Sequence, residues 1–401
     1  MKKLLLLIVF ITIIVHINVG CMPDSAAIAK AEELLPTAPR LANLLGADEL
    51  DDYASVREPR RFSFPADHGP HPEYRNEWWY ITGNLNSEDA RRFGFELTIF
   101  RFALTPDSLP NDSAWRSNQV YIGHFAITDA AAGDFHVAQR YSRGGVGLAG
   151  AQSEPLRIWL EDWELIETQV GRDSGGNAIS AWNLRARVTD IEIDLTLTAQ
   201  KPPVLNGRDG LSQKSSTPGN ASYYYSIPRL YTTGTLRSGT ESLRVDGLSW
   251  LDREWGSGGL SKEQQGWDWF ALQLSDGSDL MFYNLRRNDG TQDKHSAGTY
   301  IAADGTSTRL TRDDVRIDVL EHWDSPNGGR YPIAWQMDVE SLDLKLRLTP
   351  IMAGQELSTL VRYWEGAVDV EGYDGNNMAI TGRGYVELTG YAEATVLTSS
   401  K

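Results

Sequence analysis

From Arg61 onward the chain alternates apolar and polar residues with a period of two. Residues 191–198 and 342–349 are the clearest cases, with an apolar side chain at every second position. Because successive side chains of a β-strand point to opposite faces, this pattern predicts antiparallel strands with one packed and one wet face. Turn-forming runs of Gly, Asn and Asp recur at short intervals, as at 174–177 and 288–290. The sequence therefore predicts an all-β fold.

The β-rich part contains an internal repeat. A Trp-rich strand, a strand that follows an Ala-Trp pair and a Gly-containing closing strand occur in the same order in both halves. We therefore predict two related β-units, at 60–245 and 246–395, with longer loops in the first, at 103–118 and 200–225. Closing each unit into a barrel would remove exposed strand edges. The landmarks are Trp79, Trp182 and Trp250 in the first half, and Trp269, Trp335 and Tyr385 in the second.

The N-terminus has the pattern of a lipoprotein export signal. Two lysines precede an apolar run at 4–17, which is shorter than the roughly 20 residues of a membrane-spanning helix. The next residues resemble a bacterial lipobox and end in Cys21, the one Cys of the chain. We expect 1–21 to comprise the signal and the lipidated Cys, and 22–59 to be a tether.

The residue after this Cys indicates the destination. Met22, rather than Asp, follows it, so we expect an exported protein anchored by lipid in the outer membrane of a Gram-negative bacterium, facing the periplasm. Secretion with a free thiol is the alternative.

The charge balance excludes one class of partner. Asp and Glu number 54 against 38 Lys and Arg, which gives a net charge of −16. Such a surface repels phosphate backbones, so no nucleic-acid partner is expected. The sequence has no Gly-x-Ser-x-Gly nucleophile elbow and no phosphate-binding Gly loop in a strand-to-helix setting, and we expect no cofactor.

The densest group of polar and aromatic residues lies at 67–80. Two His residues there are spaced like a pair of metal ligands, but a metal site needs three or four ligands and no second pair lies nearby, so we expect no metal ion. The group either braces the entrance of a barrel or contacts a ligand. The candidate ligand contacts are His68, His71, Glu77, Trp78, Trp79 and Tyr80.

A second group lies where the first unit meets the second. Asp252 and Glu254 occupy alternate positions of a predicted strand and so share a face, whereas Arg253 points the other way. Two carboxylates on one face shift each other's pKa, which can keep one of them protonated as an acid. Asp252 and Glu254 are therefore candidate catalytic residues, with Arg253 and Trp255 as ligand contacts. The alternative is a buried Arg–carboxylate network that locks the two units together.

A third group supplies an aromatic wall. Trp267, Trp269, Tyr283 and Asn284 lie on a predicted strand pair and are candidate ligand contacts. The alternative is that these aromatic side chains simply fill the core. The Tyr run at 223–225 either lines the mouth of a cavity or packs a loop.

Three motifs together resemble the AttH/CrtC-like family. They are Asp-His-Gly-x-His-Pro at 67–72 with Glu-Trp-Trp-Tyr-x-x-Gly at 77–83, Trp-x-Asp-x-x-Trp-Gly at 250–256, and Gly-x-Gly-Tyr-x-Glu-Leu-Thr-Gly-Tyr at 382–391. The family includes carotenoid 1,2-hydratases, also called hydroxyneurosporene synthases, and secreted lipoproteins described as predicted hydrolases. The resemblance covers nearly all of 60–395 and implies tandem lipocalin-like β-barrels.

The resemblance also implies a lyase that adds water to a C=C bond. Such chemistry needs an acid, aromatic faces that stabilise a carbocation, and a placed water. In the hydratases the positions of Arg253 and Asn284 hold His and Asp, and neither Arg nor Asn can act as an acid. Three functions stay open: hydratase-like chemistry on an isoprenoid or other apolar lipid bound at the cleft between the units, a non-catalytic lipid carrier, or a secreted hydrolase.

Overall fold

The computed structural model describes residues 52–106, 113–172, 178–359 and 361–392, and all of these belong to one compact unit. Strands dominate these residues, with two short 3₁₀-helices, η1 (Ala66–His68) and η2 (Glu340–Leu342), and no α-helix in the described ranges. The predicted all-β class is confirmed. The expected signal, lipidated Cys21 and most of the tether lie outside the described residues.

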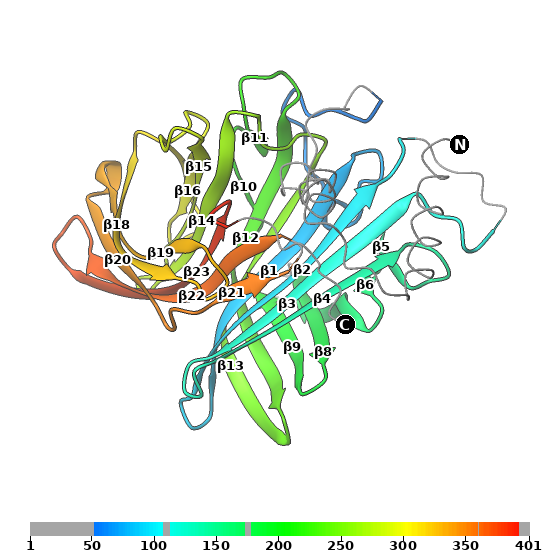
Figure 1. Cartoon of the computed structure of the whole chain (residues 1–401), viewed down its shortest axis with the longest axis horizontal. Coiled ribbons are helices and arrows are strands. Elements are labelled where there is room, and N and C mark those ends of the chain that lie inside the picture. The colour runs from blue at the N-terminus through cyan, green and yellow to red at the C-terminus, as the bar shows by residue number, and fades with distance from the viewer. Residues whose placement is uncertain (1–51, 107–112, 173–177, 360, 393–401) are drawn as a thin grey trace, which may run out of the picture. The chain divides into compact units, whose positions relative to one another are not determined.

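The first of two sheets contains thirteen antiparallel strands and nearly closes into a barrel. Its strands appear in blue to green in Figure 1. They are β1 (Asn76–Ser87), β2 (Arg92–Ala103), β3 (Gln119–Asp129), β4 (Asp134–Arg143), β5 (Ala149–Ser153), β6 (Leu156–Leu160), β7 (Trp163–Arg172), β8 (Ala178–Val188), β9 (Ile191–Ala199), β10 (Val204–Leu205), β11 (Leu211–Gln213), β12 (Ala221–Ser238) and β13 (Glu241–Gly256).

The second sheet contains ten strands and forms a half-barrel, drawn in yellow-green to red in Figure 1. Its strands are β14 (Gln264–Leu274), β15 (Asp279–Arg287), β16 (Ala297–Ile301), β17 (Ser307–Thr311), β18 (Val315–Asp324), β19 (Arg330–Val339), β20 (Leu344–Pro350), β21 (Glu356–Ser358), β22 (Arg362–Tyr373) and β23 (Ala379–Thr389).

Nine strands follow each other in the same order in both sheets. The first sheet runs β4-β3-β2-β1-β13-β12-β9-β8-β7 and then adds β6 and β5, with β10 and β11 paired to β12. The second runs β17-β16-β15-β14-β23-β22-β20-β19-β18, with β21 paired to β22. Each pair of sequence landmarks falls on equivalent strands, which are β1 and β14, β8 and β19, and β13 and β23. The tandem arrangement is therefore present in the topology as well as in the sequence.

The two sheets divide between Gly256 and Gln264. Strand β13 continues across residue 246, the predicted start of the second unit, and pairs with β1 and β12 on both sides of it. The first sheet therefore contains the whole Trp-x-Asp-x-x-Trp-Gly motif.

Strand alternation gives each sheet a core on one face and a shared seam on the other. Trp79 and Ile81 of β1 pack in the core of the first barrel, whereas Tyr80 between them joins a separate cluster with side chains of the second sheet. We call the space between the two sheets the seam. Hydrogen bonds cross it: Asn84 Nδ2 donates to the carbonyl oxygen of Gly384 over 2.9 Å, and the Tyr80 hydroxyl donates to Glu365 over 2.7 Å.

Candidate functional site

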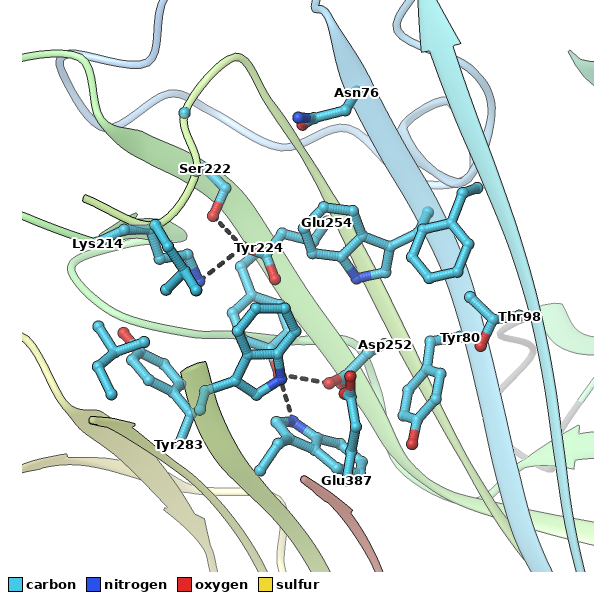
Figure 2. Close-up of a pocket in the computed structure, with 18 of the residues that line it drawn as sticks. Asn76, Tyr80, Thr98, Lys214, Ser222, Tyr224, Asp252, Glu254, Tyr283 and Glu387 are labelled. Carbon is cyan, nitrogen blue, oxygen red and sulfur yellow. Dashed lines mark hydrogen bonds and ion pairs between the residues drawn. The ribbon is translucent and has the colours of Figure 1, made fainter. Parts of the chain in front are cut away.

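A cavity of about 110 Å³ lies in the seam, with walls from both sheets. Figure 2 shows side chains from β1, β12, β13 and the second sheet pointing into it. Its aromatic lining comprises Trp78, Tyr80, Phe100, Tyr224, Trp267, Trp269, Tyr283 and Tyr363. The aromatic walls suit an apolar ligand, and the lining also contains several carboxyl groups and one Lys.

Asp252 is the best-connected carboxyl group of the cavity. It lies opposite Tyr80 in the β1–β13 register and is almost fully buried. One carboxyl oxygen accepts hydrogen bonds from Ser226 Oγ over 2.5 Å and from Trp250 Nε1 over 2.7 Å, and the other accepts the Tyr224 hydroxyl. Trp269 Nε1 donates to this Tyr224 oxygen over 3.0 Å, so the second sheet helps to orient the group.

The surroundings of Asp252 shift its pKa toward neutral pH. Burial raises the pKa of Asp252 to about 7, because the charged form loses its water, and the nearby Glu254 acts in the same direction. Hydrogen bonds from Ser226, Tyr224 and Trp250 stabilise the charged form and limit the rise. A carboxyl group with this pKa is available both as an acid and as a base near neutral pH.

Glu254 and Lys214 form an ion pair beside Asp252. Lys214 Nζ lies 2.7 Å from Glu254 Oε1, and Ser222 Oγ also donates to this carboxylate. Burial alone would lower the pKa of Lys214, but the Glu254 carboxylate raises it above its usual value. The same ammonium lies over the ring of Tyr283, 4.7 Å from its centroid. The pair gives the cavity one strongly polar end.

Three further carboxyl groups lie in the seam without a cationic partner among the described residues: Glu96, Glu365 and Glu387. Burial raises the pKa of Glu365 well above its usual value, and Glu387 and Glu96 add to the shift. The pKa of Glu387 rises to about 8, first through burial and then through the charges of Asp252 and Glu254. One oxygen of Glu96 is buried without a hydrogen-bond partner among the described residues. This end of the cavity therefore favours protonated carboxyl groups.

The other face of β1 and β13 carries a different arrangement. Glu77 is fully buried inside the first barrel, between the guanidinium groups of Arg101 and Arg253. Arg253 lies over the ring of Trp79 at 4.1 Å from its centroid. His71 donates its backbone N–H to Glu77 over 3.0 Å. The two guanidinium groups supply the counter-charge of Glu77, and none of these residues lines the cavity.

The remaining predicted ligand contacts also lie away from the cavity. His68 Nδ1 is 2.6 Å from the Tyr225 hydroxyl, and Trp255 stacks on His71 with centroids 3.9 Å apart, both within the first barrel. Asn284 Nδ2 donates to Asp268 over 3.1 Å on the half-barrel side of β15.

The structure therefore divides the predicted site residues between two places. Those at the cavity are Asp252, Glu254, Trp78, Tyr80, Trp267, Trp269 and Tyr283. Those elsewhere are His68, His71, Glu77, Trp79, Arg253, Trp255 and Asn284.

Several cavity residues were not singled out from the sequence. Tyr224 belongs to the noted Tyr run, and its position between two other tyrosines gave no indication of its partner Asp252. Lys214 lies in the long loop region of the first unit, and Glu365 carries no motif. Glu387 belongs to the closing family motif, and the period-two pattern of β23 could have placed it on one face with Tyr385.

The described residues contain neither a candidate metal-binding group nor a candidate membrane-spanning helix. No group of three or more His, Cys, Asp or Glu side chains in them is arranged to hold a metal ion. None of their helices has the length and apolar character needed to cross a membrane.

Known proteins share this architecture. The crystal structure of a protein described as AttH from Nitrosomonas europaea superposes with a TM-score of 0.71 at 33% identity, covering 84% of this chain and 100% of the relative. Kievitone hydratase from Nectria haematococca gives a TM-score of 0.63 at 15% identity, covering 88% and 98%, which shows a shared fold.

A curated relative is similar in sequence over a shorter region. Dehydratase asqC from Emericella nidulans is 26% identical over 198 residues, which are 46% of this chain and 54% of the relative, so the chain spans about half the length of that protein. The sequence pattern described as AttH-like matches residues 55–391. The resemblance of the three motifs is thereby confirmed, and the chain belongs to the AttH-like family.

Proposed function

We propose that this protein is a hydro-lyase that adds water to, or removes it from, an apolar substrate bound in the seam cavity, with an isoprenoid or related lipid as the substrate class. The observation that carries the proposal is the position of Asp252, a buried carboxyl group with a pKa of about 7 in an aromatic cavity. Two similar proteins, kievitone hydratase and dehydratase asqC, are named for this reaction class.

The proposed chemistry uses Asp252 in both directions. In hydration, neutral Asp252 donates its proton to one alkene carbon, and the oxygen of water bonds to the other carbon and releases a proton. In dehydration, the leaving hydroxyl takes up a proton from solvent as the C–O bond breaks and water departs, and the ionised group takes the proton from the neighbouring carbon. Tyr224, Ser226 and Trp250 stabilise the ionised form, and the aromatic walls stabilise positive charge on the substrate. Glu254, fixed by Lys214, is placed to accept a hydrogen bond from the water.

The test follows oxygen from water. We would incubate the protein with a lipid extract in ¹⁸O-labelled water and search by mass spectrometry for products that gain or lose one water or incorporate the label. Asp252→Asn should reduce this turnover by about 10²- to 10⁴-fold, since an amide cannot transfer the proton. Asp268→Asn is the matched control, because Asp268 is also a buried carboxyl group with a raised pKa but faces the half-barrel.

Other outcomes would identify other functions. A lipid that co-purifies with the protein and binds Asp252→Asn equally well, without any labelled product, would indicate a carrier. Label in a carboxylate product together with a cleaved partner would indicate a hydrolase. Wild-type turnover that Asp252→Asn leaves unchanged would refute the role of Asp252.

We also propose that the protein acts at a membrane, as an exported lipoprotein anchored through Cys21 and facing the periplasm. The support is the N-terminal pattern of residues 1–21. Wild-type protein should incorporate radiolabelled palmitate and sediment with outer membranes. Cys21→Ala should abolish the labelling and release mature protein to the soluble fraction, and labelling that persists in Cys21→Ala would refute the anchor.

A further inference from the structure

A second pocket, of about 300 Å³, lies beside the seam cavity. It is formed by the turn before β11, the residues before and at the start of β16, and β17. The charged side chains that line it are basic: Arg208, Lys294 and Arg309 carry fixed charges, and His295 lies among them. We call this the basic pocket.

The charge of the basic pocket contrasts with the charge of the chain. The protein carries 54 acidic against 38 basic residues, yet no Asp or Glu lines this pocket in the described part of the chain. The neighbouring Asp293 accepts from His295 at 2.7 Å and pairs with Arg287, so its charge is already engaged. Arg208, Lys294 and Arg309 have no carboxylate within ion-pair distance among the described residues. Three uncompensated cations around one hollow produce a local positive potential that attracts anions.

The turn that presents Arg208 has a defined backbone geometry. Gly207 has a φ of 73°, and a Cβ atom there would lie 2.2 Å from the carbonyl oxygen of Leu211, so the turn requires glycine. Arg208 and Leu211 exchange backbone hydrogen bonds of 2.9 and 3.0 Å across this turn. On the opposite side, Ser296 Oγ accepts the backbone N–H of Leu285 over 2.9 Å.

The basic pocket and the seam cavity share a wall. Tyr283 lines both spaces, and its hydroxyl lies 2.9 Å from Ser212 Oγ. Lys214, at the polar end of the seam cavity, contacts the ring of the same Tyr283, and Figure 2 shows the two side chains next to each other. Tyr283 is thus the partition between the two spaces, and a molecule that passes its ring would place its apolar part against the aromatic walls and its polar end among the cations.

We propose that the basic pocket binds the phosphate or carboxylate head group of an amphiphile whose apolar part occupies the seam cavity. The inference rests on the proposed function because it assigns an anionic head group to the substrate of that site. Phosphate and carboxylate share the chemistry that Arg recognises, namely a planar fork of donors for two oxygens.

The experiment compares three probes by calorimetry with the full mature chain: geranyl phosphate, geraniol and inorganic phosphate. Geranyl phosphate should bind about tenfold or more tightly than either of the others, and only its advantage over geraniol should decrease as ionic strength rises. Arg208→Gln combined with Arg309→Gln should remove that advantage and leave geraniol binding unchanged. The charge-matched control is Arg244→Gln combined with Lys345→Gln, two exposed cations outside the pocket lining, which should change nothing.

The outcomes separate this inference from the proposed function. Geranyl phosphate that binds no better than geraniol, or that does not bind at all, would overturn the anion site. Inorganic phosphate that binds as tightly as geranyl phosphate would overturn the head-group assignment in favour of a free-anion site. Loss of the phosphate preference in the Arg pair supports the head-group site, whether or not Asp252→Asn lowers ¹⁸O turnover. If the wild-type protein prefers geranyl phosphate to geraniol but shows no turnover, the hydro-lyase function is refuted and the anion site in the basic pocket is still supported.

Discussion

Buried carboxyl groups on the two sides of the β1–β13 strand pair have pKa values shifted in opposite directions. Inside the barrel, burial alone would raise the pKa of Glu77, but Arg253 and Arg101 lower it far below its usual range. In the seam, burial raises the pKa of Glu365, and the neighbouring carboxyl groups raise it further. Both side chains are almost fully buried. Burial by itself therefore does not distinguish them, and the presence of a cationic partner does.

This contrast separates a structural network from a candidate reaction site. A compensated carboxylate stays ionised at every physiological pH and can brace the barrel entrance, but it cannot exchange protons with a substrate. Uncompensated groups such as Asp252 and Glu387 titrate near neutral pH, at a cost in stability. The same strand pair thus carries a compensated ion network on one face and Asp252, a carboxyl group with a raised pKa, on the other.

The largest effect is expected inside the barrel. Glu77→Gln would leave the buried Arg101 and Arg253 without their counter-charge and should lower the free energy of unfolding by about 3–5 kcal/mol. Chemical denaturation measures this change, with the exposed Glu73→Gln as the control. A loss below about 1 kcal/mol would mean that the network does not depend on the carboxylate charge.

The second prediction concerns the pH dependence of turnover. In the proposed reaction, hydration requires protonated Asp252, and dehydration requires ionised Asp252 together with a proton for the leaving hydroxyl, so the two directions share one overall protonation state. The kcat/KM of both directions should therefore be level below pH 7 and fall about tenfold per pH unit above 7, or about 100-fold over two units. Steady-state rates in both directions, measured across this range, check the prediction. An inflection near the ordinary Asp value for both directions would show that Asp252 does not carry the proton.

The third prediction is a Glu-to-Gln change in the seam, at Glu365, that should stabilise the protein where Glu77→Gln destabilises it. The folded-state pKa of Glu365 lies above its unfolded value, so the native protein becomes less stable as pH rises from about 4.5 through the folded pKa. Glu365→Gln does not titrate, and its amide oxygen can still accept from Tyr80. The variant should therefore be more stable than the wild type by about 1–2 kcal/mol at pH 8, with the difference vanishing near pH 4.5. Thermal unfolding at both pH values measures this, and a less stable variant at pH 8 would contradict the contrast between the faces.

The smallest effect is expected for an ion pair at the edge of the seam. Arg92 pairs with Asp369 of the second sheet at 2.6 Å, but the Asp369 side chain is 42% exposed. Solvent screens such a pair, so Arg92→Gln should cost no more than about 1 kcal/mol, and high salt should reduce even that. Denaturation at low and high salt tests this, and a loss near that of Glu77→Gln would show that partly exposed charges are as important as buried ones.

Part of the site followed from strand geometry alone. Alternate positions of one strand share a face, so Asp252 and Glu254 were expected together, with Arg253 on the opposite face, and the structure has this arrangement. The same rule did not say which face would meet the second sheet. The predicted contacts at 67–80 were therefore divided between the seam and the barrel interior.

The partners of the catalytic candidates could not be predicted in this way. Tyr224 and Ser226 reach Asp252 from β12, and Lys214 reaches Glu254 from the segment before it. Glu365, which accepts the Tyr80 hydroxyl, comes from the second sheet, more than two hundred residues away from Tyr80 in the sequence. No local sequence pattern predicts these side-chain contacts, because they depend on the register of strand pairs and on the packing of the two sheets.

The amino-acid sequence by itself determined the all-β class, the tandem repeat and the family, since period-two alternation, turn residues and ordered motifs are local properties of the chain. Only the tertiary structure decided which carboxyl groups are compensated and which are not. The reason is physical: a pKa depends on burial and on charges a few ångströms away in space, and in this protein those charges come from distant strands.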